Sequence, residues 1–411
     1  MKTTESKPKR LLFLDALRGF ALLGIALANY PEFSLYSFLS DSEAASMPTA
    51  TADTWTHAAQ LLFVDGKFYT IFSILFGIGF SIIIANARQR GADGMRVFYR
   101  RMGALCTIGL LHLMLLWSGD ILLLYALMGM LLPLFYSRSD RTVLGWAAAM
   151  LVLPVLCDGA IALTGIGPSV VPYDAWWYWC GRMGITEENF ATWLRDADSY
   201  GKVLQFLLQG AFERMWEFVG SHRYFKVLGL FLIGLYIGRK GIHAHIAEHR
   251  SLLRNVVHIG LGIGLPVSLA YTWSGMNGQP LGHVVHSTFY LLSVYPQGIG
   301  YAALLALIYQ RCSGSVVWKA LSMPGRMSLT TYLCQSILGI ILFYGIGFGL
   351  GCSLGLWPTE LVAIGVFVFQ TILATVWLRT FAYGPFEWLW RMITYGRFIN
   401  PLSRPTSGKR Q

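Results

Sequence analysis

The chain has 411 residues, of which 55% are hydrophobic and 13% are charged, and its formal net charge is +11. A water-soluble protein of this size has too little interior to hide so much apolar surface, so the repeated hydrophobic runs indicate a polytopic membrane protein. The basic residues stand in short segments between these runs, as membrane topology requires. This placement excludes nucleic acid as the partner and makes the lipid bilayer the expected one.

The first hydrophobic stretch, residues 11–30, is long enough to cross a bilayer but carries Asp15, Arg18 and Asn29. A charged side chain at the centre of a membrane helix costs roughly 2.5–3.5 kcal/mol, so these groups should face other helices or a cavity. Asp15 and Arg18 are one turn apart and can pair, whereas Arg18 and Asn29 lie close to three turns apart on one face. This polar stripe predicts a functional site, with a helix-bridging ion pair as the alternative.

Hydropathy predicts an all-α fold with about ten membrane-spanning helices. The predicted spans are residues 11–30, 58–85, 102–118, 120–137, 143–165, 224–239, 255–274, 286–310, 329–350 and 360–379. Lysine and arginine are concentrated in alternate loops, so the positive-inside rule places both termini in the cytoplasm.

A long segment with charges of both signs separates two membrane halves of five spans each. The predicted divisions are a cytoplasmic segment at 1–10, a first membrane half at 11–165, an extracytoplasmic loop at 166–223, a second membrane half at 224–395 and a disordered cytoplasmic tail at 396–411. Two stretches, residues 203–219 and 385–395, have the pattern of amphipathic helices that lie on a membrane surface.

The second span contains two charged residues, Asp65 and Lys67, that its hydropathy predicts to be buried. Residues two apart on a helix point in different directions, so each needs its own partner elsewhere. Asp15 and Arg18 of the first span are the candidates.

Two histidines are candidates for a general base. His112 falls in the outer half of the third span, and Asp120 follows it at a tight turn. Histidine exchanges protons near neutral pH, and a carboxylate can orient it. A hydrogen-bonded histidine that bridges two helices is the alternative. His57, at the outer end of the second span, is the other candidate base.

The ninth span begins with a basic residue at its cytoplasmic entrance, Arg326. Together with Arg101 it can bind phosphate groups from the cytosol. Tyr332 and Gln335 follow on one face of this span. The chain has no Walker motif and no H-E-x-x-H sequence, so ATP hydrolysis is unsupported, and the histidines and cysteines lack the spacing of a metal site.

Five stretches occur in the order RLLFLDALRGFALLGIALAN, VDGKFYTIFSILFGIGF, LLHLMLLWSGDILLLYALMG, GRMSLTTYLCQSILGIILFYG and WLRTFAYGPFEWLWRMIT. Together they resemble the YeiB family of bacterial inner-membrane proteins. The resemblance covers residues 11–395 or so and implies location in the bacterial inner membrane. The second half, from about residue 220, resembles a catalogued domain of unknown function.

The YeiB family is placed in a wider transmembrane acyltransferase superfamily, with lysosomal heparan-α-glucosaminide N-acetyltransferase and the O-antigen acyltransferases. The LDxxRG motif of the O-acyltransferases matches Leu14, Asp15, Arg18 and Gly19. Where those enzymes have a histidine eleven residues after the arginine, this chain has Asn29. The heparan enzyme is similar to this chain at that position, where it also has asparagine followed by tyrosine. His57 is the nearest positional match to that enzyme's catalytic histidine, although its spacing to Asp65 is not clearly preserved.

The resemblance implies an acyltransferase that takes an acyl group from cytosolic acyl-CoA, as co-substrate, to a sugar hydroxyl or an amine on the other side. The expected catalytic residues are His112 or His57 as base, Asp120 orienting the histidine, and Asn29 or Lys67 stabilising the oxyanion. The expected substrate-binding residues are Asp15, Arg18, Asp65, Lys67, Arg101, Arg326, Tyr332 and Gln335. A transporter or flippase that uses the same polar groups is the alternative, and the sequence leaves open whether the chain forms a homodimer.

Overall fold

The computed structural model of the protein describes residues 11–89 and 91–402, and every regular element within them is a helix, as predicted. The first half contains α1 (Leu12–Phe33), η1 (Tyr36–Phe38), α2 (Asp41–Ser46), α3 (Ala50–Phe63), α4 (Lys67–Gln89), α5 (Gly94–Leu115), α6 (Leu122–Gly129), η2 (Leu132–Phe135), α7 (Asp140–Thr164) and α8 (Val170–Met183). The rest of the described chain contains α9 (Glu187–Phe190), α10 (Tyr200–Gly220), α11 (Arg223–Arg239), α12 (Arg250–Met276), α13 (His283–Cys312), α14 (Val316–Arg326), α15 (Ser328–Phe343), α16 (Leu356–Thr380) and α17 (Pro385–Tyr395).

Six helical segments of the described chain are long and apolar enough to cross a membrane. They are α1, the pair α3 and α4 taken together, α7, α12, α13 and α16. Two further pairs pass the same test together but bend sharply, by 65° between α10 and α11 and by 79° between α14 and α15, which makes up to eight. Each predicted span overlaps one or two helices, and the count of about ten stays a prediction.

The outer helices of the bundle expose many large apolar side chains on their outward faces. Within their most apolar windows, α7 and α12 bury only 22% and α16 only 33% of the residues. Leu163, Ile259 and Val376 are among the large apolar side chains left open. A contiguous apolar surface of this extent fits a lipid environment.

The predicted second span is interrupted at its polar residues. Helix α3 ends at Phe63, and α4 begins at Lys67 after a turn in which Gly66 has φ +71°. Glycine adopts this left-handed conformation without the steric cost that a side chain would add. The turn therefore places Asp65 at a break in the helix, beside the interior of the bundle.

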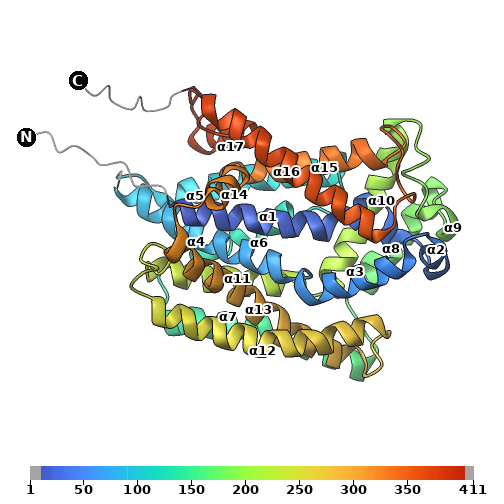
Figure 1. Ribbon diagram of the computed structural model, residues 1–411, viewed down its shortest axis with the longest axis horizontal. Helices are drawn as coiled ribbons and strands as arrows, with labels where there is room; N and C mark the ends of the chain where they lie inside the picture. Colours follow the sequence, from blue (N-terminus) through green and yellow to red (C-terminus); the bar gives the residue numbers. More distant parts are fainter. Residues whose placement is uncertain (1–10, 90, 403–411) are drawn as a thin grey trace, which may run out of the picture.

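Helix α1 runs through the middle of the bundle, where α4, α13, α14, α15 and α16 surround it (Figure 1). Its crossing with α14 is very close. A Cβ added to Gly19 would lie 1.9 Å from the backbone oxygen of Leu321, and one added to Gly325 would lie 1.8 Å from that of Asp15. Only glycine fits at these two positions, so the glycine of the LDxxRG motif has a packing role.

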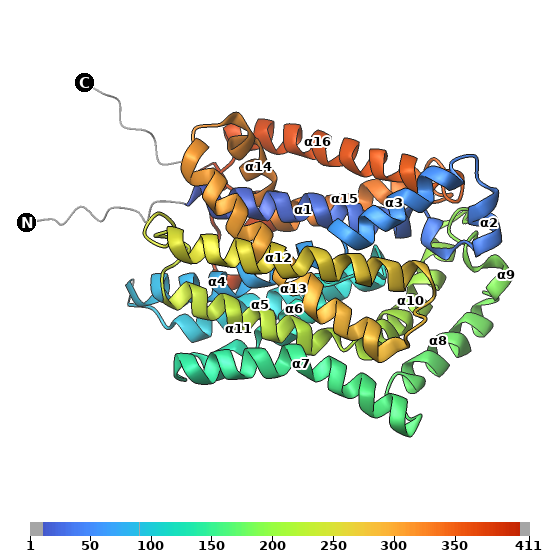
Figure 2. The ribbon, with the colours of Figure 1, turned by 60° about the horizontal axis from the view of Figure 1, so that its bottom comes forward.

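The two described ends of the chain, at the start of α1 and after α17, lie at one end of the bundle (Figure 1). Helices α2, α8 and α9 lie at the opposite end, as the rotated view also shows (Figure 2). This arrangement agrees with termini on the same side, and the cytoplasmic assignment stays a prediction. The predicted segment 1–10 and residues 403–411 of the predicted tail lie outside the described residues. Residues 396–402 turn back on α17, where Trp388 Nε1 donates to the Ile399 oxygen.

Candidate functional site

A cavity of about 640 Å³ opens inside the bundle, which is within the size range of small-molecule and cofactor sites. Its wall is built mainly by α1, α4, α5, α6, α10, α15 and α17. The turn between α3 and α4, the end of α14 and single residues of α11 and α13 complete it. The cavity therefore joins residues from both halves of the chain.

One face of α1 forms a long wall of this cavity. The lining residues on that face are Arg18, Leu22, Ile25, Asn29 and Glu32. They recur at intervals of three or four, which keeps them on one side of a helix. Fourteen residues separate Arg18 from Glu32, or about 21 Å along the axis. The predicted polar stripe of the first span is thus part of the cavity, and it reaches across most of a bilayer core.

The end of the cavity near the start of α1 is rich in arginine. The arginines that line it are Arg18, Arg101, Arg326 and Arg391. Arg18 Nη1 lies 3.0 Å from Asp15 Oδ1, which confirms the predicted ion pair. The Arg101 guanidinium lies 3.5 Å from the centre of the Trp390 ring, whose Nε1 donates to the Arg101 oxygen. Helix α17, which matches the amphipathic helix predicted at 385–395, therefore anchors α5 and adds Arg391 to this end.

Glu387 lines the same end of the cavity and caps the start of α15. Its Oε1 accepts hydrogen bonds from the Leu329 and Thr330 backbone N–H groups at 2.6 and 3.1 Å. Its Oε2 accepts one from Thr330 Oγ1 at 2.6 Å. A carboxylate is well placed at a helix N-terminus, whose first N–H groups lack partners within the helix. Burial nevertheless raises the pKa of Glu387 above its ordinary value.

At the far end of the cavity, charged side chains of both signs form a network. Glu217 pairs with Arg214 on the same helix, and Glu217 Oε1 lies 2.8 Å from Arg223 Nη2 across the bend between α10 and α11. Arg214 also donates from Nε to the Ser118 oxygen at 2.8 Å and lies 3.9 Å from Glu32. Sequence reasoning placed none of these residues in the site. The amphipathic helix predicted at 203–219 is α10, and its polar face lines the cavity.

The two charged residues of the second span have different partners, but Asp65 lies in the turn before α4 and not on a helix with Lys67, as the prediction assumed. Asp65 lines the cavity and accepts a hydrogen bond from the Tyr271 hydroxyl at 2.6 Å. Lys67 is fully buried, and its Nζ donates to the Leu61 oxygen at 2.6 Å. Lys67 is not among the residues that line the cavity. Their observed partners come from α12 and α3, and not from the predicted ion pair of α1.

The predicted His112 and Asp120 form a hydrogen-bonded pair beside the cavity. His112 Nδ1 lies 2.8 Å from Asp120 Oδ2, and His112 Nε2 lies 2.8 Å from Ser336 Oγ on α15. All three side chains are buried, and none of them is among the cavity-lining residues. Ser336 was missed because a serine in an apolar helix carries no signal in the sequence.

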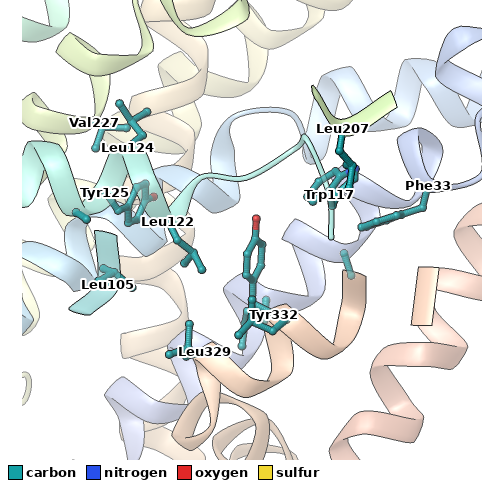
Figure 3. Close-up of a cluster of buried hydrophobic side chains, with 14 of the residues drawn as sticks. Phe33, Leu105, Trp117, Leu122, Leu124, Tyr125, Leu207, Val227, Leu329 and Tyr332 are labelled. Carbon is teal, nitrogen blue, oxygen red and sulfur yellow. The ribbon is translucent and has the colours of Figure 1, made fainter. Parts of the chain in front are cut away.

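Tyr332 lies between this buried group and the cavity. Its ring centre is 5.2 Å from that of His112, and the residue lines the cavity although it is only 5% exposed. Figure 3 shows the side chain pointing away from α15, between Leu122 and Trp117. The Ile121 backbone lies close to the hydroxyl, but the hydroxyl has no hydrogen-bond partner among the described residues. The hydroxyl oxygen is itself buried, so it meets a ligand in the cavity only when the side chain moves.

The other predicted site residues divide between the cavity and its surroundings. Asn29 lines the cavity. Gln335 lies behind the wall, where its Nε2 donates to the Leu22 oxygen at 3.4 Å and joins α15 to α1. His57 is exposed on α3 and does not line the cavity. His57 therefore lies apart from the other candidates, and its role as a base stays a prediction.

Comparisons with known proteins identify relatives over nearly the whole chain. Residues 237–397 match DUF418, a family described as a protein of unknown function. The uncharacterized protein YxaH of Bacillus subtilis is 28% identical, and the match covers 94% of each chain. The uncharacterized protein YeiB of Escherichia coli is also 28% identical, and the match covers 97% of this chain and all of YeiB. No solved structure matches the chain.

Proposed function

This chain belongs to the YeiB family, and we propose that it is a membrane acyltransferase. It moves an acyl group from cytosolic acyl-CoA to a sugar hydroxyl or an amine on the other side of the membrane. One observation carries the proposal: a single cavity joins four arginines at one end of the bundle to a network of carboxylates and arginines at the other. A donor held by the arginines and an acceptor held by the network would therefore share one space.

The arginine end suits the phosphate groups of CoA. Guanidinium groups bind phosphate oxygens through paired, charge-assisted hydrogen bonds and keep their charge at any physiological pH. Arg18, Arg101 and Arg391 come from three different helices, so they present their charge from several directions. The described ends of the chain lie at this end, and the prediction from the positive-inside rule would put it on the cytosolic side, where acyl-CoA is made.

The remainder of the cavity suits the acyl group and its acceptor. Asn29 and Tyr332 line the stretch between the two charged ends and offer hydrogen-bond donors to a polarised carbonyl. Asp65, Glu32 and Glu217 line the far half and can accept protons or hydrogen bonds from a hydroxyl or an amine. The acyl group would thus travel along α1 from a cationic to a mixed-charge environment.

A transporter or flippase is the second candidate, and one specific observation favours it. Two helix pairs, α10 with α11 and α14 with α15, break within the bundle beside the cavity. Broken helices with charged groups at the break are typical of substrate sites in transporters. In that function the substrate would cross the membrane through the cavity chemically unchanged.

The proposal is tested by measuring acyl-CoA binding to the purified full chain in detergent, by calorimetry and thermal shift. We expect saturable binding of acyl-CoA and of CoA itself, since both carry the phosphates. A charge-assisted hydrogen bond contributes about 1.5–3 kcal/mol, so Arg101→Gln and Arg391→Gln should each weaken binding about tenfold or more.

Lys319→Gln is the matched control. Lys319 stands near Arg326 on α14 but is exposed and does not line the cavity, so its substitution should leave the affinity unchanged. Equal effects of all three substitutions would indicate only a general electrostatic attraction. No binding of any acyl-CoA to a well-folded sample would overturn the transferase and leave the transporter.

A further inference from the structure

The buried group of Asp120, His112 and Ser336 has a defined order of donors and acceptors. A carboxylate only accepts hydrogen bonds, so the proton between Asp120 and His112 is carried by His112 Nδ1. His112 Nε2 then has the lone pair, and the Ser336 hydroxyl donates to it. Asp120 is itself held in place, because its Oδ1 accepts the Leu123 N–H at 2.8 Å. This carboxylate–imidazole–hydroxyl order activates serine for acyl transfer in unrelated folds.

The surroundings of His112 limit what it can deprotonate. Its Nε2 faces Ser336, and the ring does not line the cavity. An acceptor in the cavity cannot give a proton to Nε2 while the Ser336 hydroxyl donates to that atom. If His112 is a base in this protein, the first proton that it takes is therefore that of Ser336.

We propose that Ser336 is a nucleophile that carries the acyl group as an ester between donor and acceptor; this inference rests on the proposed acyltransferase function. It makes the reaction a two-step transfer through a covalent intermediate. Asp120 and His112 are then positioned for Ser336, and not directly for the acceptor molecule.

Access to Ser336 passes Tyr332. The two residues are one turn apart on α15, and Tyr332 both lines the cavity and packs on the ring of His112. The Tyr332 side chain therefore lies between the cavity and the buried group of Asp120, His112 and Ser336, and the donor reaches Ser336 only when this side chain moves. A wall of this kind also keeps water from the ester.

The chemistry balances without any further reactant. Ser336 Oγ bonds to the carbonyl carbon of the thioester while its proton passes to His112 Nε2. The carbon–sulfur bond breaks, and the imidazolium gives that proton to the departing CoA thiolate. In the second step the hydroxyl or amine of the acceptor attacks the ester carbon and gives its proton to Nε2. The carbon–oxygen bond to Ser336 breaks, and the imidazolium returns a proton to Oγ.

The inference is tested without knowing the acceptor. Full-length protein in detergent is mixed with radiolabelled acetyl-, octanoyl- or palmitoyl-CoA, quenched in acid, digested and analysed by mass spectrometry. We expect a peptide that carries the acyl group on Ser336. One free CoA thiol should be released for each acyl group attached. Ser336→Ala and His112→Ala should still bind the donor but should release CoA about 10³-fold or more slowly.

Two further variants make the result specific. Ser336→Cys should carry the acyl group as a thioester, which neutral hydroxylamine cleaves far faster than the oxygen ester of the unchanged protein. Ser293→Ala removes another fully buried serine hydroxyl, on α13, and should be labelled like the unchanged protein. The linkage test on Ser336→Cys remains decisive even if Ser336→Ala fails to fold.

Each outcome decides the inference. Donor binding without any covalent label, label on another residue, or unchanged CoA release by Ser336→Ala would overturn the role of Ser336 and leave an acyltransferase with direct transfer. Failure of the unchanged protein to bind any donor would overturn the proposed function together with this inference.

Discussion

Gly325 on α14 lies so close to Asp15 on α1 that a Cβ added to the glycine would be 1.8 Å from the Asp15 backbone oxygen. The contact sets the distance between the two helices that carry Arg18 and Arg326 to the cavity. The shape of the arginine end therefore depends on a residue that has no side chain.

We expect Gly325→Ala to push α1 and α14 apart. Overpacking of this kind costs about 1–3 kcal/mol, so thermal unfolding in detergent should occur at a lower temperature and CoA binding should weaken. Gly103→Ala is the control, because a Cβ there meets nothing within 4 Å. Replacing a glycine by alanine in the interior of a helix raises the free energy of unfolding by roughly 0.5–1 kcal/mol. Equal behaviour of the two variants would show that the crossing is not tightly packed.

The ion pair of Glu217 and Arg223 should hold the bend between α10 and α11. Its atoms are 2.8 Å apart, and both side chains are about a third exposed, to 34% and 28%. Glu217→Gln and Arg223→Gln should each lower the free energy of unfolding. The double variant should lower it by less than the sum of the two single effects, with a coupling energy of about 1 kcal/mol. Denaturant unfolding of the four proteins measures this coupling. Strictly additive losses would mean that the pair does not stabilise the bend.

The pH dependence of stability should contain a contribution from Glu387. Burial raises the pKa of this carboxyl in the folded protein, so the folded protein keeps the proton at pH values where the unfolded chain has lost it. The contribution is complete below the ordinary pKa of glutamate and is lost as pH rises through the higher folded value. Thermal unfolding over this range should show the decline, and Glu387→Gln, which stays neutral, should flatten it. An unchanged pH profile in the variant would contradict this.

Tyr332→Phe should separate stability from turnover. The hydroxyl has no hydrogen-bond partner among the described residues, so its removal should change the free energy of unfolding by less than about 0.5 kcal/mol. Loss of a donor to a developing oxyanion typically slows the reaction by about 10²–10³-fold. We therefore expect normal donor binding and much slower CoA release. Lower stability with unchanged CoA release would show that Tyr332 only fills space.

The sequence predicts those features of the fold that depend on the pattern of residues within one helix. Hydropathy marks the stretches that become helices, and residues at helical spacing share a face, so Arg18 and Asn29 both reach the cavity. The different partners of Asp65 and Lys67 arise instead from the turn at Gly66, which takes Asp65 off the helix. The sequence signal for the bend is Gly66 itself, a glycine between the charged residues Asp65 and Lys67.

The contacts that the sequence could not predict depend on packing between distant segments. His112 and Ser336 are 224 residues apart in the chain, and only the packing of α5 near α15 brings them together. Arg214 and Glu217 stand in a segment whose amphipathic pattern predicts a membrane surface. That pattern fits equally well a helix whose polar face covers a cavity, and a single sequence does not distinguish the two.

The most direct test of the central proposal is vectorial transfer in proteoliposomes that contain the full chain in one orientation. Acyl-CoA is added on the side of the arginine end, and a hexose or an amino sugar is enclosed on the side of α10. The account predicts an acylated sugar on the α10 side while CoA stays where it was added. Passage of the unmodified sugar across the membrane, with the donor intact, would contradict it and indicate a transporter.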